Sequence, residues 1–169
     1  SKYPYWLIYR DKEFDKVADT MTFDCFDVFR DRQITNSFLK SSGDIRVIKS
    51  RNINDAGTEI VDISGYDGYV NECDVKGLSV YKYLDSETVY LTPNMTYKPR
   101  VIQKPKHTLV NGSVAILIPK TPALPTKEQL SYFSTEEYRE FYRTARNRQT
   151  RSLNVDNSSV FFFGIKRSK

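Results

Sequence analysis

Five arginines gather in one segment near the C-terminal end of the sequence: Arg139, Arg143, Arg146, Arg148 and Arg151. The first three recur every three or four residues, a spacing that places side chains on one face of a helix. Guanidinium groups donate paired hydrogen bonds to phosphate oxygens. We therefore expect a basic helix that holds the phosphates of a polyanion such as DNA, through Arg143, Arg146, Arg148 and Arg151.

A second polar cluster follows the alternating segment 45–49 and contains Lys49, Arg51 and Asn52. Arg and Asn pair bidentately with the edges of guanine and adenine, whereas Lys suits phosphates. We expect Arg51 and Asn52 to read bases and Lys49 to contact the DNA backbone. The alternative is an ordinary turn in which Asn52 caps backbone groups.

A third cluster lies in the loop between Pro93 and Pro99, which presents Tyr97 and Lys98 and leads to Arg100. Lys98 and Arg100 are candidates for phosphate contacts, and Tyr97 is a candidate for a base contact. The alternative is a rigid connection between strands, because proline fixes the backbone on both sides of the loop.

Positive charge is concentrated in the second half of the chain, although the net charge is only +5. Residues 1–97 contain 12 Lys and Arg against 16 Asp and Glu, whereas residues 98–151 contain 11 against 4. This asymmetry is typical of a protein with an acidic partner. The alternative is a solvated basic face that binds nothing.

Several classes of site are not indicated by the sequence. It contains no glycine-rich phosphate loop, nucleophile elbow or paired-histidine metal motif. Two cysteines, Cys25 and Cys73, and one histidine favour a reduced, cytoplasmic protein without a metal site. No apolar run is long enough to span a membrane, and no signal peptide is visible. Asp74 and Lys76 resemble the end of a metal-dependent nuclease motif, but a solvated loop is the preferred interpretation.

Hydrophobic periodicity predicts an α/β protein of the α+β type, with a largely antiparallel sheet and a few helices. The 169 residues suffice for one domain with its own core. Strands are expected over 5–9, 24–30, 45–49, 58–63, 78–83, 88–91, 100–103, 113–118 and 159–165. Helices are expected from Asp11 onward and over 35–39, 127–132 and 134–150.

Two local signals fix these elements further. Ser134 with Glu137 predicts a capping box at the start of the basic helix, and an apolar stripe follows at helical spacing, made of Tyr138, Phe141, Tyr142 and Ala145. Asn111-Gly112 between two apolar runs predicts a β-hairpin.

Taken in order, segments from nearly the whole chain resemble the C-terminal target-recognition domain of type II restriction-modification adenine-specific DNA methyltransferases. They are distantly similar to the recognition domains of type I specificity subunits as well. The segments are 31–35 (DRQIT), 45–53 (IRVIKSRNI), 91–100 (LTPNMTYKPR), 111–117 (NGSVAIL) and the tail from Tyr132 through 151–154 (RSLN) to 163–165 (FGI).

The resemblance implies that residues 1–169 form a single DNA target-recognition domain, which we expect to be a fragment of a longer methyltransferase. It also implies a separate catalytic domain that binds S-adenosylmethionine, carries an Asn/Asp-Pro-Pro-aromatic tetrad and flips the target adenine out of the stack. The present sequence lacks this tetrad. We therefore expect no cofactor and no methyl transfer in the fragment itself, and as partners double-stranded DNA and the catalytic domain.

Three alternatives stay open at this point. The chain can be a recognition domain of the type I specificity-subunit kind. It can be a non-catalytic protein-interaction module whose helix 134–150 docks a partner or its own catalytic domain through Tyr138, Phe141 and Tyr142. The least favoured alternative is a small nuclease that uses Asp74 and Lys76.

Overall fold

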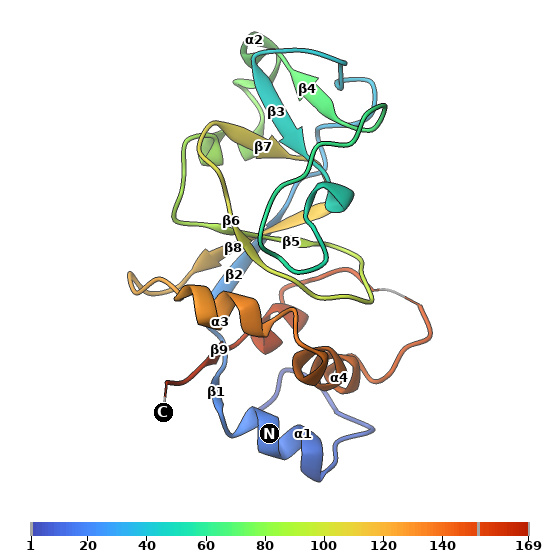
Figure 1. Cartoon of the computed structure of the whole chain (residues 1–169), viewed down its shortest axis with the longest axis vertical. Coiled ribbons are helices and arrows are strands. Elements are labelled where there is room, and N and C mark those ends of the chain that lie inside the picture. Colours follow the sequence, from blue (N-terminus) through green and yellow to red (C-terminus); the bar gives the residue numbers. More distant parts are fainter. Residues whose placement is uncertain (1, 152, 169) are drawn as a thin grey trace.

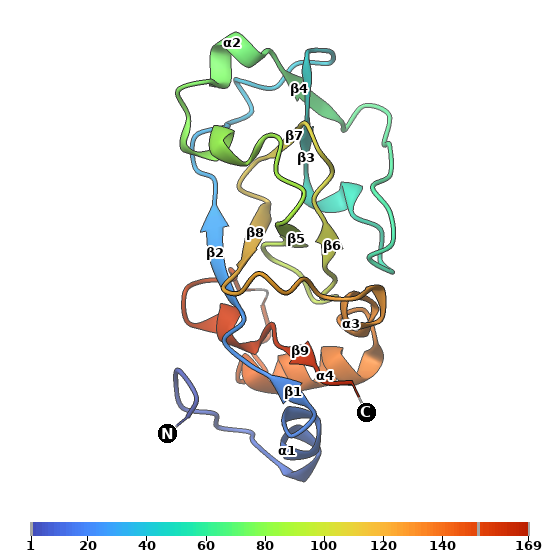
Figure 2. The same ribbon diagram turned by 90° about the vertical axis from the view of Figure 1, so that its left-hand side faces the viewer.

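The chain forms an elongated molecule in which a central sheet separates two lobes (Figure 1). The computed structural model describes residues 2–151 and 153–168, so that Ser152, part of the segment 151–154 noted above, lies outside the described residues. The first lobe contains a small sheet and helix α2 (Glu72–Val75). The second contains three helices below the central sheet (Figure 2): α1 (Lys12–Ala18), α3 (Lys127–Tyr132) and α4 (Glu136–Ala145).

Antiparallel pairing dominates three separate sheets. The central sheet is antiparallel throughout, in the order β2 (Phe26–Arg30), β8 (Val114–Pro119), β5 (Tyr90–Pro93), β6 (Ile102–Gln103). The sheet of the first lobe has the order β4 (Gly68–Val70), β3 (Ile45–Ile48), β7 (Thr108–Val110), and only its β3–β7 pair is parallel. The third sheet pairs β1 (Met21–Thr22) with β9 (Ile165–Lys166).

Three 3₁₀ helices complete the described structure: η1 (Ser50–Asn52), η2 (Ser79–Tyr83) and η3 (Ser159–Phe162). The predicted class, a mixed α+β fold with mostly antiparallel pairing, is therefore confirmed. Within the described residues, however, the strands form three sheets, where the sequence indicated one.

Strand β8 is apolar at successive positions because both faces of the central sheet are covered. Ala115 and Leu117 belong to the aromatic core under the helices, whereas Val114 and Ile116 belong to the aliphatic core of the first lobe. All four are fully buried. Successive side chains of a strand point to opposite faces, so a strand between two cores must be apolar on both.

Helix α4 buries the apolar stripe that the sequence predicted. Tyr138, Phe141, Tyr142 and Ala145 are all buried in the aromatic core. Phe141 stacks on Phe14 of α1 at a centroid distance of 4.6 Å. This burial confirms the stripe and contradicts the alternative in which the same side chains dock a separate partner, because they already pack within the domain.

The predicted capping box at Ser134 is wrong by one residue. Helix α4 begins after Thr135, whose hydroxyl oxygen accepts a hydrogen bond from the N–H of Tyr138 at 3.2 Å. Ser134 instead donates to the carbonyl of Ala56 at 2.8 Å, and Glu137 accepts from the hydroxyl of Tyr132 at 2.7 Å. Both side chains that fit the box are therefore engaged in longer-range contacts.

Several predicted elements differ from the structure. The segments 58–63 and 78–83 contain only an isolated bridge and the 3₁₀ helix η2, respectively, and 35–39 forms a turn. The segment 159–165 is buried as predicted but begins as η3. The segment 5–9 is irregular, and Trp6 within it is 81% exposed. Short apolar runs satisfy several periodicities at once, which explains why the pattern failed here.

The Asn111-Gly112 turn forms, but it does not make a hairpin. It connects β7 to β8, and these strands lie in different sheets. The N–H of Val114 donates to the carbonyl of Asn111 at 3.2 Å, so the local turn is present. Strand β8 then pairs with β2 and β5, because its two apolar faces are buried only in the central sheet.

Candidate nucleic-acid interface

The end of α4 turns the chain back alongside the helix. Asn147 and Arg148 have left-handed backbone conformations, with φ of 55° and 50°. The N–H of Arg148 donates to the carbonyl of Arg143 at 2.8 Å, and the N–H of Asn147 donates to that of Thr144 at 2.9 Å. These are the two hydrogen bonds of a Schellman motif. The turn brings residues 149–151 to the same hollow as the helix.

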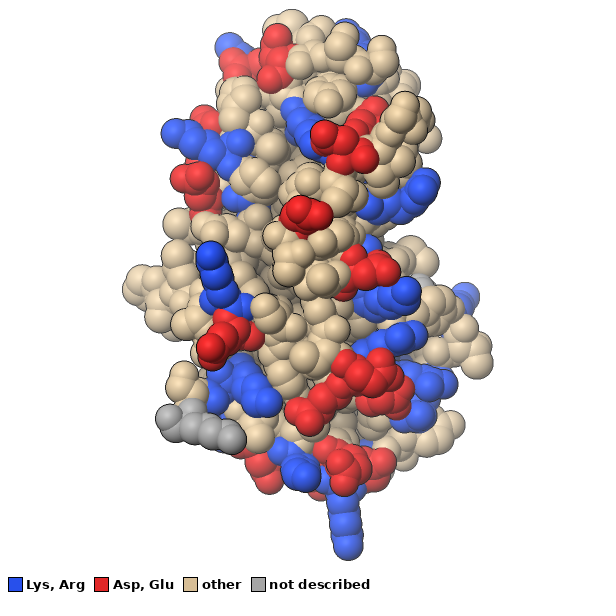
Figure 3. Space-filling view, in the orientation of Figure 1, with Lys and Arg blue, Asp and Glu red and all other residues tan. Residues whose placement is uncertain are grey.

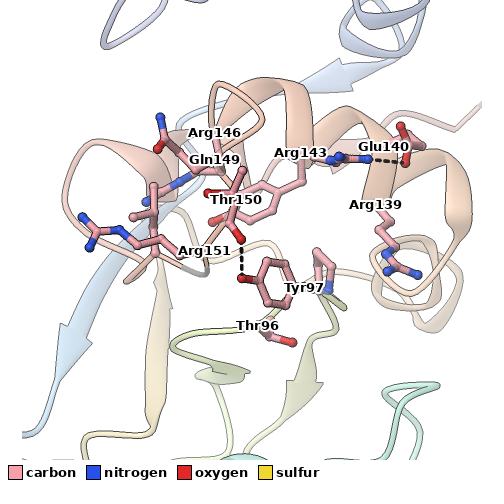
Figure 4. A pocket seen from close by; sticks show the side chains of 12 residues that line it. Thr96, Tyr97, Arg139, Glu140, Arg143, Arg146, Gln149, Thr150 and Arg151 are labelled. Carbon is pink, nitrogen blue, oxygen red and sulfur yellow. Dashed lines mark hydrogen bonds and ion pairs between the residues drawn. The ribbon is translucent and has the colours of Figure 1, made fainter.

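This hollow is a cleft of about 370 Å³ between α4, the residues that follow it and the loop 96–99 (Figure 4). We call it the arginine cleft because four arginines line it, namely Arg139, Arg143, Arg146 and Arg151. Tyr97 lines the opposite wall, and its hydroxyl donates to the carbonyl of Thr150 at 2.9 Å. The structure thus brings four of the predicted residues together: Tyr97, Arg143, Arg146 and Arg151.

The arginine cleft carries a net positive charge. Glu140 is the one acid among the described residues that line it. A carboxylate oxygen of Glu140 lies 3.9 Å from Arg143, whose side chain is 58% exposed. An exposed ion pair of this length contributes little, so Arg143 is available to a stronger anion. Arg139 likewise has only an exposed contact with Glu136, at 3.7 Å.

Arg146 is held more firmly than the other arginines of the cleft. Its Nη2 donates to the carbonyl of Asn154 at 3.0 Å, and its guanidinium lies 5.9 Å from the ring centre of Tyr142. Its Nη1 is buried near the Tyr142 hydroxyl but makes no well-aligned hydrogen bond. Burial raises the pKa of Tyr142, and the nearby Arg146 only partly opposes this. Tyr142 therefore stays neutral and does not offset the positive charge of Arg146.

Arg148 does not line the arginine cleft. It lines a neighbouring hollow between α1 and α4 that is rich in acids, including Glu13 and Glu137. Its guanidinium donates to the hydroxyl of Thr144 at 3.1 Å and lies 3.7 Å from Glu140. Arg148 thus faces an acidic environment, which does not favour the phosphate contact predicted for it.

Asn52 cannot read bases, contrary to the prediction, because it is fully buried. Its side-chain oxygen accepts from the N–H of Lys49 at 3.0 Å, and its Nδ2 donates to the carbonyl of Val61 at 3.0 Å and to Asp67 at 2.7 Å. Burial alone would raise the pKa of Asp67, but the hydrogen bonds from Ile63 and Asn52 and the charge of Arg46 outweigh it, and this pKa is lowered. Asn52 therefore stabilises a turn, which is the alternative interpretation of this segment of the sequence.

Arg100 cannot hold a phosphate, also contrary to the prediction. It is 7% exposed, and burial lowers its pKa. Its guanidinium donates to four oxygen atoms: the carbonyls of Ile53 (3.1 Å), Lys98 (2.8 Å) and Ser50 (3.4 Å) and the hydroxyl of Thr96 (3.2 Å). Arg100 therefore joins η1 to the loop that carries Tyr97.

Lys49 and Arg51 both lie against Tyr66, a residue that the sequence did not single out. Lys49 Nζ lies 3.9 Å and the Arg51 guanidinium carbon 4.8 Å from the ring centre. Lys49 also donates to the carbonyl of Tyr66 and is half-buried, whereas Arg51 is exposed. Only Arg51 is thus freely accessible to DNA. No local pattern identifies Tyr66, because the contact spans fifteen residues of irregular chain.

The remaining predicted residue, Lys98, is exposed on the loop beside the arginine cleft. Its Nζ lies 3.3 Å from a carboxylate oxygen of Asp55, and both side chains are solvated. The contact is therefore weak, and Lys98 stays available to a phosphate.

The two residues of the possible nuclease motif, Asp74 and Lys76, form ion pairs with different partners. Asp74 lies 3.5 Å from Lys40, and Lys76 lies 3.6 Å from Glu72. Across residues 2–151 and 153–168, no group of three or more His, Cys, Asp or Glu is arranged to hold a metal ion. In the same ranges, no helix has the length and apolar character needed to cross a membrane.

Figure 3 shows lysine and arginine side chains along the right-hand edge of the lower half of the molecule, with acidic side chains beside them. The basic surface is therefore a band on one side and does not cover the whole face. No protein-family model matches this chain, and no curated protein matches its sequence.

Proposed function

We propose that this chain is a target-recognition domain that binds double-stranded DNA and positions it for adenine-N6 methyl transfer by a separate catalytic domain. The arginine cleft carries the DNA-binding part of the proposal, because four arginines and Tyr97 line one hollow. The methyltransferase part rests on the resemblance of segments such as 45–53 and 91–100. On this proposal S-adenosylmethionine binds the catalytic domain.

Arginine suits this role because its planar guanidinium pairs with two phosphate oxygens at once. Each phosphate that a protein neutralises releases counterions, so log affinity falls with log salt by about 0.9 per contact. If each of the four arginines of the cleft holds one phosphate, this cleft alone gives a slope of log affinity against log salt of about −3.6. Lys98 adds to this value, since it lies on the adjoining loop.

The surroundings of the cleft also support DNA as the ligand. Arg100 fixes the loop 96–98 relative to η1, so Tyr97, Lys98 and Arg51 keep their relative positions. A rigid arrangement of this kind is what register on a duplex requires. Cys25 and Cys73 are free thiols, which suits the cytoplasm, where we place the protein.

The test measures binding of a fluorescent duplex pool of mixed sequence at several salt concentrations. The double variant Arg143→Ala, Arg151→Ala should bind more weakly, with a salt slope less steep by about 2. Both side chains are exposed, so the fold should remain intact. Arg32→Ala is the matched control, because Arg32 is exposed and lies outside the cleft. Failure of the unmodified chain to bind any duplex, or binding that ignores salt, would refute the proposal.

A further inference from the structure

Tyr66 contacts both the backbone and the side chain of Arg51. The hydroxyl of Tyr66 accepts a hydrogen bond from the backbone N–H of Arg51 at 3.2 Å. The ring of Tyr66 lies under the guanidinium, whose carbon is 4.8 Å from the ring centre. Cation–π contact with an aromatic face restricts the guanidinium while leaving its N–H edge uncovered.

The donors of this guanidinium are not engaged elsewhere. Among the described residues, the Arg51 side chain has no carboxylate partner within salt-bridge distance and donates no hydrogen bond to another side chain or carbonyl. Arg46, on the preceding strand, differs in this respect, because it pairs with Asp62 at 2.5 Å and with Asp67 at 3.5 Å. Arg51 is therefore an oriented, exposed and unpaired guanidinium.

Such a guanidinium matches one base in particular. The major-groove edge of guanine presents two acceptors, O6 and N7, and a bidentate arginine is their commonest partner. An arginine that is already oriented loses less conformational entropy on binding than a free one. A phosphate also accepts from arginine, but it carries no sequence information and does not need the guanidinium to be fixed.

The position of Arg51 relative to the arginine cleft is also fixed. Arg100 binds the first residue of η1 and the residue that follows η1, through the carbonyls of Ser50 and Ile53. The same guanidinium binds Thr96 and the carbonyl of Lys98, which flank Tyr97 in the cleft wall. The fold therefore holds Arg51 at a constant distance from the wall of the arginine cleft.

We infer that Arg51 is a specificity-determining residue that reads a guanine in the major groove, and that Tyr66 is its positioning residue. This inference rests on the proposed function, since it concerns the same DNA surface. It adds the identity of one base and a residue that holds the reading side chain.

The experiment selects bound duplexes from a randomised pool and sequences them. The unmodified chain should enrich a motif with at least one strongly preferred guanine. Arg51→Ala should lose the preference at that single position, a change of about 5- to 150-fold in discrimination against other bases. Arg51→Lys should lose most of it, because an ammonium cannot form the planar bidentate pair.

Variants of Tyr66 separate positioning from stability. Tyr66→Phe loses the hydrogen bond to the Arg51 N–H but keeps the ring under the guanidinium, and should keep most of the guanine preference. Tyr66→Leu removes the ring and should weaken the preference at the same position as Arg51→Ala. A thermal unfolding curve for each variant shows whether the fold is intact. Arg32→Ala is a control and should keep the preferred base, because Arg32 is exposed and lines neither the arginine cleft nor the ring of Tyr66.

Two outcomes overturn the inference in distinguishable ways. If Arg51→Ala lowers affinity equally for all sequences and flattens the salt slope, Arg51 holds a phosphate, and this inference fails while the proposed function stands. If the unmodified chain binds no duplex in the pool, the proposed function fails and this inference fails with it.

Discussion

Lys104 provides a stability test that depends only on the fold. The side chain is 1% exposed, and its Nζ donates to the carbonyls of Leu84 at 2.9 Å, Pro105 at 3.0 Å and Ser86 at 3.4 Å. Burial lowers the pKa of this ammonium from 10.5 to about 8, although Asp85 and Glu87 oppose the shift.

The sign of the effect follows from the two states of the chain. Between pH 8 and pH 10.5 the unfolded chain keeps the Lys104 proton while the folded chain loses it, so the free energy of unfolding rises with pH in this range. The full shift corresponds to about 3 kcal/mol, of which about 2 kcal/mol should appear by roughly pH 9.5. Below about pH 8 both states are protonated, and this contribution is constant.

The buried tyrosines act in the opposite direction at higher pH. Burial raises the pKa of Tyr138 well above 10.0, so the unfolded chain loses the phenolic proton first and stability falls above that pH. Comparison with Lys104→Met removes this background, because both proteins contain the same tyrosines.

The assay is urea unfolding of the unmodified chain and of Lys104→Met at several values between about pH 7.5 and 9.5. The difference in unfolding free energy between the two should change by about 2 kcal/mol across this range, in favour of the unmodified chain. Lys106→Met, at an exposed neighbouring lysine, should leave the slope unchanged. A difference that does not vary with pH would show that burial does not perturb Lys104 as argued.

Three smaller predictions concern the elements that position the interface. Thr135→Ala should lower the unfolding free energy by about 1 kcal/mol through loss of the α4 cap, and unchanged stability in Thr135→Ala would contradict the observed helix start. Asn147→Ala should cost more than Asn147→Gly in a thermal melt, since glycine keeps the left-handed turn at φ 55°. Asn52→Ala should destabilise the chain by about 1–3 kcal/mol, because the partly buried N–H of Lys49 loses its acceptor and Asp67 and the carbonyl of Val61 each lose one donor. Each loss is measured by chemical or thermal unfolding, and unchanged stability in Asn52→Ala would contradict its structural role.

Part of the fold follows from local patterns. The stripe from Tyr138 to Ala145 predicts the buried face of α4, and Thr126 predicts the start of α3, whose cap accepts from Gln129. These signals succeed because a helix and its cap are made by residues within a few positions of one another. The strand β8 is predicted for a similar reason, as an unbroken apolar run.

Sheet membership depends on distant residues and was predicted less well. Asn111-Gly112 has the local chemistry of a hairpin turn, yet β7 pairs with β3, some sixty residues earlier in the chain. Ser134 and Glu137 likewise fit a capping box and form other contacts. A local pattern limits the structures that a segment can adopt. The packing of the whole chain then selects the structure that buries the most apolar surface.

The candidate interface likewise combines features that the sequence predicts with features that only the folded structure determines. The sequence by itself determined that basic residues are concentrated after residue 97 and that three segments carry arginines suited to anions. It could not show that Arg51 is exposed and Arg100 is buried. The tertiary structure buries Arg100 among four oxygen acceptors and leaves Arg51 exposed on Tyr66. Accessibility is set by residues far apart in the chain, so only the folded structure decides which arginines meet a ligand.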